Sequence, residues 1–191
     1  MSDSEGDAST YAVVLDFLAH GRQDGGGPGY GQSPVGYAVG EESFRLFELG
    51  FAEGTDVSIG DRVAVDPTAR AADIESVREI EYEDLSGGAQ SELEYVIEEI
   101  VEDQEDRFVE FFNDAQPITL RLHQLNLLPG IGKKLRNGIL DARKREAFDS
   151  FEDLEDRIAG LHDPKGVIAE RILEELQTED LKYRIFARRE E

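Results

Sequence analysis

Short apolar runs separated by Gly, Pro and Asp fill the first part of the chain, between Thr10 and Glu83. Runs of this length, bounded by turn-forming residues, predict β-strands rather than helices. We expect strands at 11–18, 35–39, 44–49, 62–65 and 74–82. Five short strands predict a small antiparallel β-barrel of the OB type, although an SH3-like barrel shows much the same pattern.

The pattern changes to a helical period after Ser86-Gly87-Gly88. Apolar residues then recur at three- and four-residue spacing while Asp and Glu fill the opposite face, which is typical of an amphipathic helix. This stripe predicts one long connecting helix over 89–113 and consists of Leu93, Val96, Ile97, Ile100, Val101, Phe108, Phe111 and Phe112. After Pro117 we expect further helices at 118–127, 133–144 and 164–177, with a shorter one at 151–159.

The order of these elements predicts an α+β protein with distinct parts. We expect a disordered acidic tail at 1–9, an OB-like barrel domain at 10–84, the connecting helix within 85–114 and an all-α domain at 115–191. A Gly-rich stretch at 24–31 lacks the Gly-Lys-Ser/Thr of a P-loop and predicts a hairpin loop. Some aromatic residues of the barrel would either stack on bases or belong to its core, namely Tyr11, Tyr30, Tyr37, Phe44 and Phe47.

Charge is divided unevenly along the chain. The formal net charge is -23, but residues 1–114 carry -22 and residues 115–191 only -1. Within the second part, residues 116–145 hold seven basic residues and one acid, Asp141. A polyanion should bind nucleic acid only through such a local cationic region. This cationic island consists of Arg121, Lys133, Lys134, Arg136, Arg143, Lys144 and Arg145.

The composition also suggests where the protein works. Only five of the twenty basic residues are Lys, Cys is absent, and carboxylates are spread over nearly every surface-like segment, as in proteins of salt-accumulating halophiles. Without Cys, disulfides and thiolate metal sites are excluded, which agrees with a reducing cytoplasm. No apolar run approaches the ~18 residues of a membrane span, and the acidic start is unlike a signal peptide. We expect a soluble cytoplasmic protein with no membrane partner.

One segment combines glycines, apolar residues and adjacent lysines between two predicted helices. It runs Leu128-Pro129-Gly130-Ile131-Gly132-Lys133-Lys134. The glycines allow a tight turn with positive φ and leave no side chain to block a phosphate. The amides of both glycines and both lysines would face outward at a helix N-terminus, which favours anions. We therefore predict a phosphate-binding turn, anchored by Leu128 and Ile131, that carries no base specificity.

This segment resembles the helix-hairpin-helix motif of DNA repair enzymes, resolvase subunits and ribosome-associated proteins. The match continues to Ile139-Leu140 but departs at Leu135-Arg136, where that motif has a small residue followed by Ala. The resemblance also implies a monovalent cation, K⁺ or Na⁺, held by the backbone carbonyls of Asn126, Leu128 and Ile131. With the cationic island, the motif predicts a nucleic-acid-binding surface made by Gly130, Ile131, Gly132, Lys133, Lys134, Arg136, Arg143 and Lys144.

A second copy of the motif follows. It keeps Ala169-Glu170-Arg171-Ile172-Leu173 in register but has Asp163-Pro164-Lys165 where the glycines belong. Because a carboxylate there would repel phosphate, we expect this copy to be structural. Residues 115–191 are thus predicted to form a tandem helix-hairpin-helix domain with a degenerate second copy.

More of the chain resembles one particular group. The segments that carry the likeness are 11–16, 95–101, 107–113, the glycine motif and 148–153. They resemble the archaeal domain of unknown function 655 family over nearly everything after residue 10. The resemblance implies an OB-like barrel joined to helix-hairpin-helix units and a nucleic-acid-binding role. It lends no catalytic residue.

No feature of the sequence argues for an enzyme. His20, His123 and His162 lack metal-ligand spacing, no carboxylate pair stands out, and nucleophile-elbow, zincin and Walker motifs are missing. Our first hypothesis is a non-enzymatic protein that binds RNA rather than DNA. The alternatives are a DNA-binding accessory factor and a protein-protein adaptor with a degenerate motif. The acidic N-terminal domain suits a protein partner at least as well as nucleic acid.

Overall fold

The computed structural model describes residues 10–21, 33–67, 70 and 72–187. The predicted tail at 1–9 and the whole Gly-rich stretch at 24–31, including Tyr30, therefore lie outside the described residues. The chain divides into two compact units. The N-terminal unit comprises Met1–Val96 with Ala187–Glu191, and the C-terminal unit comprises Ile97–Phe186.

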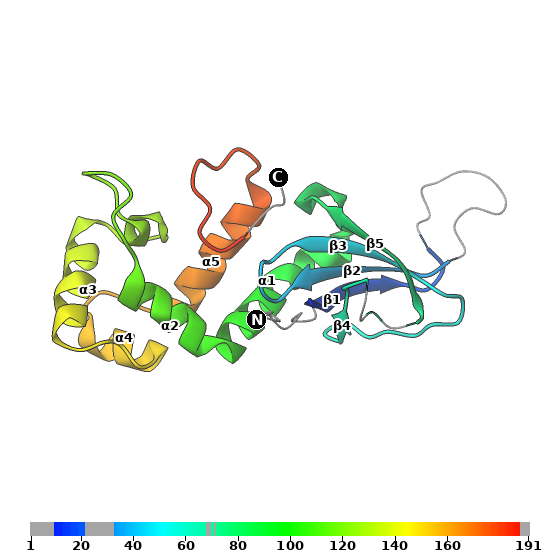
Figure 1. Ribbon diagram of the computed structural model, residues 1–191, viewed down its shortest axis with the longest axis horizontal. Coiled ribbons are helices and arrows are strands. Elements are labelled where there is room, and N and C mark those ends of the chain that lie inside the picture. The colour runs from blue at the N-terminus through cyan, green and yellow to red at the C-terminus, as the bar shows by residue number, and fades with distance from the viewer. Residues whose placement is uncertain (1–9, 22–32, 68–69, 71, 188–191) are drawn as a thin grey trace, which may run out of the picture. The chain divides into compact units, whose positions relative to one another are not determined.

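A curled antiparallel sheet forms the N-terminal unit (Figure 1). Its strand order is β4-β1-β2-β3-β5, so the short β4 and β5 are its edges. All five predicted strands are confirmed, as β1 (Tyr11–Leu18), β2 (Val35–Gly40), β3 (Leu46–Phe51), β4 (Arg62–Ala64) and β5 (Ile74–Ile80). β3 begins later than expected because Phe44 has a φ of 57°, which takes it out of the strand conformation.

Alternating side chains build the core of this sheet. The cluster consists of Ala12, Ala38, Phe47, Leu49, Phe51, Val65 and Ile74. Phe51 packs so closely on β2 that a Cβ at Gly36 would lie 2.7 Å from its ring. Burying a phenylalanine of this kind stabilises a fold by about 1.5–3 kcal/mol. Of the five aromatic residues considered for stacking, Tyr37, Phe44 and Phe47 are core.

The single long helix predicted over 89–113 is wrong. After a short 3-10 helix, η1 (Tyr82–Asp84), the structure has α1 (Gly87–Asp103) and α2 (Glu105–Asp114), separated at Gln104. Gln104 leaves the helical conformation, with φ −109° and ψ 35°. The five residues from 102 to 106 are four acids and one glutamine, with no apolar side chain. A continuous helix would therefore gain little stability from packing there.

Short helices make up the rest of the C-terminal unit. They are η2 (Gln124–Leu127, a 3-10 turn), α3 (Lys133–Arg145), α4 (Phe151–Arg157) and α5 (Pro164–Gln177), so the last three predicted helices are confirmed. The helix expected at 118–127 is wrong. Instead, Pro117 and His123 pair in a small hairpin that precedes η2. The hydroxyl of Thr119 accepts hydrogen bonds from the amides of Arg121 and Leu122, which competes with helix formation.

Candidate nucleic-acid interface

The predicted phosphate-binding turn joins η2 to α3. Gly130 has a φ of +77°, a conformation that side chains disfavour, so the turn requires glycine here. The amide of Ile131 donates to the carbonyl of Leu128 at 3.2 Å and closes the turn. Leu128 and Ile131 are both buried, as expected of anchors between the elements on either side.

The N-terminus of α3 is open. Its N-cap is Gly132, which offers no side chain, and the first turn contains no acid. The amide of Arg136 is the first to return into the helix, to the carbonyl of Gly132 at 3.0 Å. The amides of Lys133, Lys134 and Leu135 precede it and have no carbonyl within the helix. These groups can therefore donate to an external anion.

Gly132 differs from Gly130 in what the fold demands of it. Its φ of −89° and ψ of −167° are ordinary extended values. A Cβ built on Gly132 would meet nothing within 4 Å. The fold would thus accept a larger residue at this position. The glycine instead keeps the space in front of the α3 amides clear.

Asn126 holds the turn in place. Its side-chain Nδ2 donates to the carbonyl of Ile131 at 3.2 Å, and its Oδ1 accepts from the amide of His123 at 3.2 Å. The same Oδ1 accepts from Nη1 of Arg136 at 3.1 Å. His123 Nδ1 accepts from the amide of Leu125 at 3.1 Å. Burial, with the positive charges of Arg143 and Arg136, lowers the pKa of His123, which favours the neutral acceptor.

The predicted basic residues fall into two groups. Arg136 is bound to Asn126, and Arg143 donates to the carbonyl of Phe112 at 3.1 Å, so both support the fold. The other group is exposed and, among the described residues, makes no hydrogen bond or ion pair. It consists of Lys133, Lys134 and Lys144. Of the five basic residues predicted for the nucleic-acid-binding surface, three are therefore free to bind an anion.

Of the carbonyls expected to hold a monovalent cation, those of Leu128 and Ile131 are in this turn and that of Asn126 is in η2. Leu128 and Ile131 already accept hydrogen bonds, from the Ile131 amide and the Asn126 side chain. Each carbonyl oxygen keeps a second lone pair, and a set made only of oxygens suits an alkali ion. The three carbonyls thus match the implied ion in donor type. Within the described ranges, no cluster of three or more His, Cys, Asp or Glu side chains forms a metal site.

The second copy, between α4 and α5, has the opposite electrostatics. Its N-cap residue Asp163 accepts from the amide of Gly166 at 3.2 Å. The Asp163 amide in turn donates to Oε1 of Glu155 at 2.8 Å. Two carboxylates therefore occupy the α5 N-terminus, where an anion would be repelled. Gly160, with a φ of +91°, supplies a positive-φ turn residue that the sequence analysis did not single out.

The second copy also supports the first, through a residue that sequence reasoning missed. Arg171 of α5 is 5% exposed, and its Nη1 donates to the carbonyl of Leu127 at 3.2 Å, at the entrance to the turn. Its Nε donates to Oε2 of the fully buried Glu175 at 3.0 Å. The other Glu175 oxygen accepts from the amides of Ile185 and Phe186. One buried ion pair thus links α5, the C-terminal segment and the turn.

The basic residues in the described part of the C-terminal segment, Lys182 and Arg184, have different roles. Arg184 donates to the carbonyls of Glu175, Thr178 and Glu179 at the end of α5. Lys182 remains exposed, with its ammonium group 5.3 Å from the centre of the Tyr183 ring.

The N-terminal unit has few described side chains that could bind nucleic acid. Three arginines are paired with glutamates: Arg45 with Glu79, Arg62 with Glu41, and Arg78 with Glu48. The remaining described candidate for stacking, Tyr11, has the Arg62 guanidinium 3.7 Å from its ring centre. With three candidates buried and the fourth covered, this unit presents none of its described candidate rings to bases.

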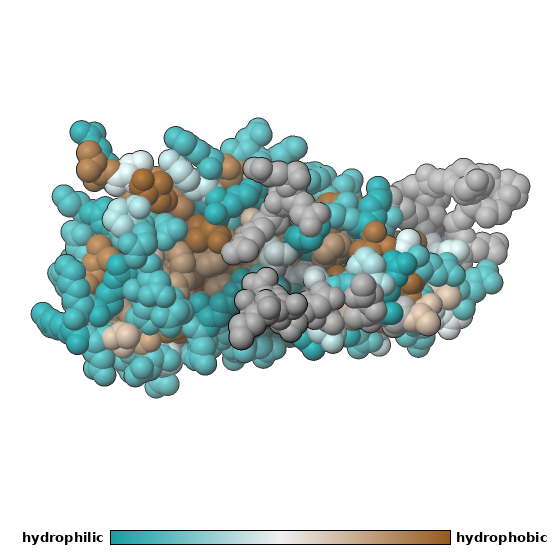
Figure 2. Space-filling view, viewed as in Figure 1, coloured by the Kyte–Doolittle hydropathy of each residue, from teal (hydrophilic) through white to brown (hydrophobic). Residues whose placement is uncertain are grey.

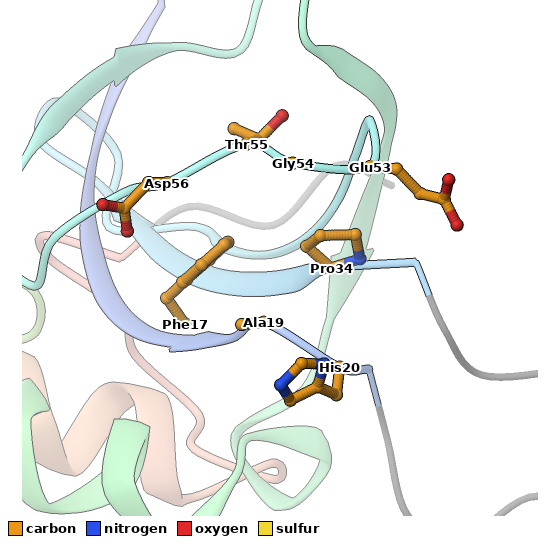
Figure 3. A pocket seen from close by; sticks show the side chains of 8 residues that line it. All are labelled: Phe17, Ala19, His20, Pro34, Glu53, Gly54, Thr55 and Asp56. Atoms are coloured by element: carbon orange, nitrogen blue, oxygen red, sulfur yellow. The ribbon is translucent and has the colours of Figure 1, made fainter.

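A pocket opens at one end of the sheet (Figure 3). It is lined by Phe17, Ala19, His20, Pro34, Glu53, Gly54, Thr55 and Asp56. Figure 3 shows Glu53 and Asp56 pointing away from each other, with His20 apart from both. The two carboxylates make this pocket unfavourable for phosphate, and the arrangement does not resemble a catalytic cluster.

The fold and sequence are similar to those of archaeal proteins. A family model described as "Protein of unknown function (DUF655)" matches residues 8–188. An uncharacterised protein of Methanocaldococcus jannaschii is 41% identical over 179 residues, which cover 93% of this chain and 79% of the relative. The crystal structure of a DUF655 protein from Archaeoglobus fulgidus matches with a TM-score of 0.85 and 39% identity, over 94% of this chain and 99% of that one. No helix in the described parts is long and apolar enough to cross a membrane.

Proposed function

Because the chain belongs to the DUF655 family and carries an open, lysine-flanked helix N-terminus, we propose that it is a non-enzymatic nucleic-acid-binding protein. Its ligand is RNA, held by the phosphate backbone at residues 128–134. The observation that carries the proposal is the combination at the start of α3: no capping side chain, an unobstructed Gly132, and exposed Lys133 and Lys134.

The chemistry of this contact is simple. The uncapped amides donate short-range hydrogen bonds to phosphate oxygens, and the two lysines add positive charge at the same place. A K⁺ or Na⁺ ion on the carbonyls of Asn126, Leu128 and Ile131 would add a further positive charge behind the phosphate. Such contacts position a nucleic acid without reading its bases. The bound strand is therefore recognised by shape.

The architecture supports the same interpretation. We describe η2-turn-α3 and α4-turn-α5 as tandem helix-hairpin-helix units, the first with a single 3-10 turn in place of its first helix. The curled sheet, in which β1 pairs with both β2 and β4, is described as an open OB-like barrel. The choice of RNA over DNA follows from this pairing of units, which is an analogy of fold. The acidic N-terminal unit, with its paired arginines, is assigned to a protein partner.

The test is a binding titration with the full-length protein. Fluorescence anisotropy would measure its affinity for a labelled structured RNA and for a DNA of matched sequence as KCl is raised. We expect tighter binding to RNA, and a shallow salt dependence because only a few phosphates are contacted. Near molar KCl, where the screening length is about 3 Å, the amide contacts should retain measurable binding.

Charge removal locates the site. Replacing both lysines, as Lys133→Gln with Lys134→Gln, should lower affinity roughly tenfold at low salt and less in molar KCl. The control, Arg62→Gln with Arg78→Gln, removes the same formal charge from the N-terminal unit and should leave affinity unchanged. Equal losses in both variants, or no binding by the folded wild-type protein, would refute the proposed function.

A further inference from the structure

A small hairpin of the C-terminal unit presents a bare apolar side chain. It spans 117–123, and Leu120 near its tip is fully exposed, at 108%. The amide of Ile118 donates to the carbonyl of Leu122 at 2.8 Å, and the amide of Thr119 donates to the same carbonyl at 3.0 Å. The amides of Arg121 and Leu122 donate to the Thr119 hydroxyl and stabilise the turn. Leu120 is thus displayed on an ordered tip.

The base of this hairpin is bonded to the phosphate-binding turn. The amide of His123 donates to Asn126, whose Nδ2 donates to the carbonyl of Ile131. Gln116 and Gln124 close the hairpin base with two further hydrogen bonds. Three residues of chain from His123 to Leu120 span at most ~10 Å. The hairpin that carries Leu120 is therefore held to the turn by hydrogen bonds at its base.

The charge around Leu120 indicates what it contacts. Arg121 follows it and is exposed, and the hairpin base is bonded to the element that carries the open α3 amides. Figure 2 shows hydrophobic and hydrophilic side chains together at the projecting end of this hairpin, at the upper left. The other exposed large apolar side chains in the described residues are Ile59 and Tyr95. Tyr95 directly follows Glu94, and Asp61 lies two residues after Ile59. An apolar tip next to cationic groups complements a base flanked by phosphates.

We propose that Leu120 packs against the face of an unstacked base beside the phosphate held at 128–134. This inference rests on the proposed function and adds a substrate class to it, namely RNA with a bulge or loop rather than a continuous duplex. Apolar side chains contact unstacked bases, and bulges and loops supply such bases at little cost. The phosphate contact then gives affinity, and Leu120 gives preference for irregular RNA.

The experiment compares two RNA hairpins of the same stem, one with a single bulged 2-aminopurine and one fully paired. Anisotropy with the full-length protein gives affinity, and 2-aminopurine fluorescence reports the stacking of the bulged base. We expect the wild-type protein to prefer the bulged RNA. Leu120→Ser should lower affinity for it about tenfold and abolish the fluorescence change, while leaving affinity for the paired RNA unchanged.

Two controls keep the outcomes distinct. Leu120→Met, which keeps an apolar tip, should behave like the wild type, and Ile59→Ser tests the loss of an exposed apolar residue elsewhere. Unchanged affinity of Leu120→Ser for the bulged RNA, or equal losses for both RNAs, overturns this inference. If the lysine variants still weaken binding in that case, the proposed function stands. If the wild-type protein binds neither RNA, both proposals fail.

Discussion

Replacing Gly132 by Asp should make the protein more stable and weaken its binding to phosphate. The extended backbone of Gly132 is suitable for a capping residue, and a Cβ there meets no atom within 4 Å. An aspartate can therefore enter without strain and accept hydrogen bonds from the first-turn amides of α3. Asp163 already caps α5 through the amide of Gly166. The substitution gives α3 an aspartate N-cap, the type of cap that α5 already has.

The magnitudes follow from the two changes. An aspartate N-cap is better than glycine by a few tenths of a kcal/mol, and its charge at the helix N-terminus adds about 0.3–1 kcal/mol. A gain of about 1 kcal/mol would raise Tm by ~2–4 °C in a protein of this size. In binding, the carboxylate occupies amides that otherwise donate to phosphate. Hydrogen bonds to charged groups contribute about 1.5–3 kcal/mol each, so affinity should fall roughly 10- to 100-fold.

The assay pairs thermal unfolding, followed by circular dichroism, with RNA anisotropy in the same buffer. Gly132→Asn is the neutral control, because it caps the helix without a charge and should weaken binding less. Asp163→Asn removes a charge from the second copy and should leave RNA affinity unchanged. A Gly132→Asp protein that is stabilised yet binds RNA like the wild type would show that the α3 N-terminus does not hold the phosphate.

The remaining predictions concern the groups that support the turn. Glu175→Gln leaves Arg171 buried without its carboxylate partner. The free energy of unfolding in urea should therefore fall by about 3–5 kcal/mol. A loss below about 1 kcal/mol would contradict the role of this buried ion pair in stability. The lowered pKa of His123 means that protonation favours the unfolded state, so its contribution to stability is complete above pH ~6.5 and declines as pH falls below that value. Urea midpoints measured on both sides of that pH should show a smaller decline in His123→Asn, and identical declines would exclude this role for His123.

The sequence predicts those elements whose cause is local. Short apolar runs bounded by turn-forming residues located all five strands, and helical spacing located α3, α4 and α5. Gly130 was identifiable because only glycine readily adopts its positive φ, and Leu128 and Ile131 because a turn between two elements needs apolar anchors.

The break at Gln104 and the burial of the Arg171–Glu175 pair were not predicted, for different reasons. The break at Gln104 does not disturb the spacing of apolar residues, because Val101 and Phe108 lie two helical turns from each other. The i, i+4 pair of Arg171 and Glu175 is indistinguishable in sequence from a solvent-exposed pair. Only the approach of the 181–186 segment, whose amides donate to Glu175, makes it a buried one.

Under the proposed function, net charge is a poor guide to what this protein binds. In the N-terminal unit, arginines such as Arg78 are neutralised by a glutamate on the neighbouring strand. In the C-terminal unit, Lys133 and Lys134 stand beside free backbone amides, which carry no net charge. If the cell is rich in salt, as the acidic composition indicates, long-range repulsion by the carboxylates is screened within about 3 Å. Contacts that act at hydrogen-bond distance are screened least, so a polyanionic protein can hold a polyanion through a turn that leaves its amides open.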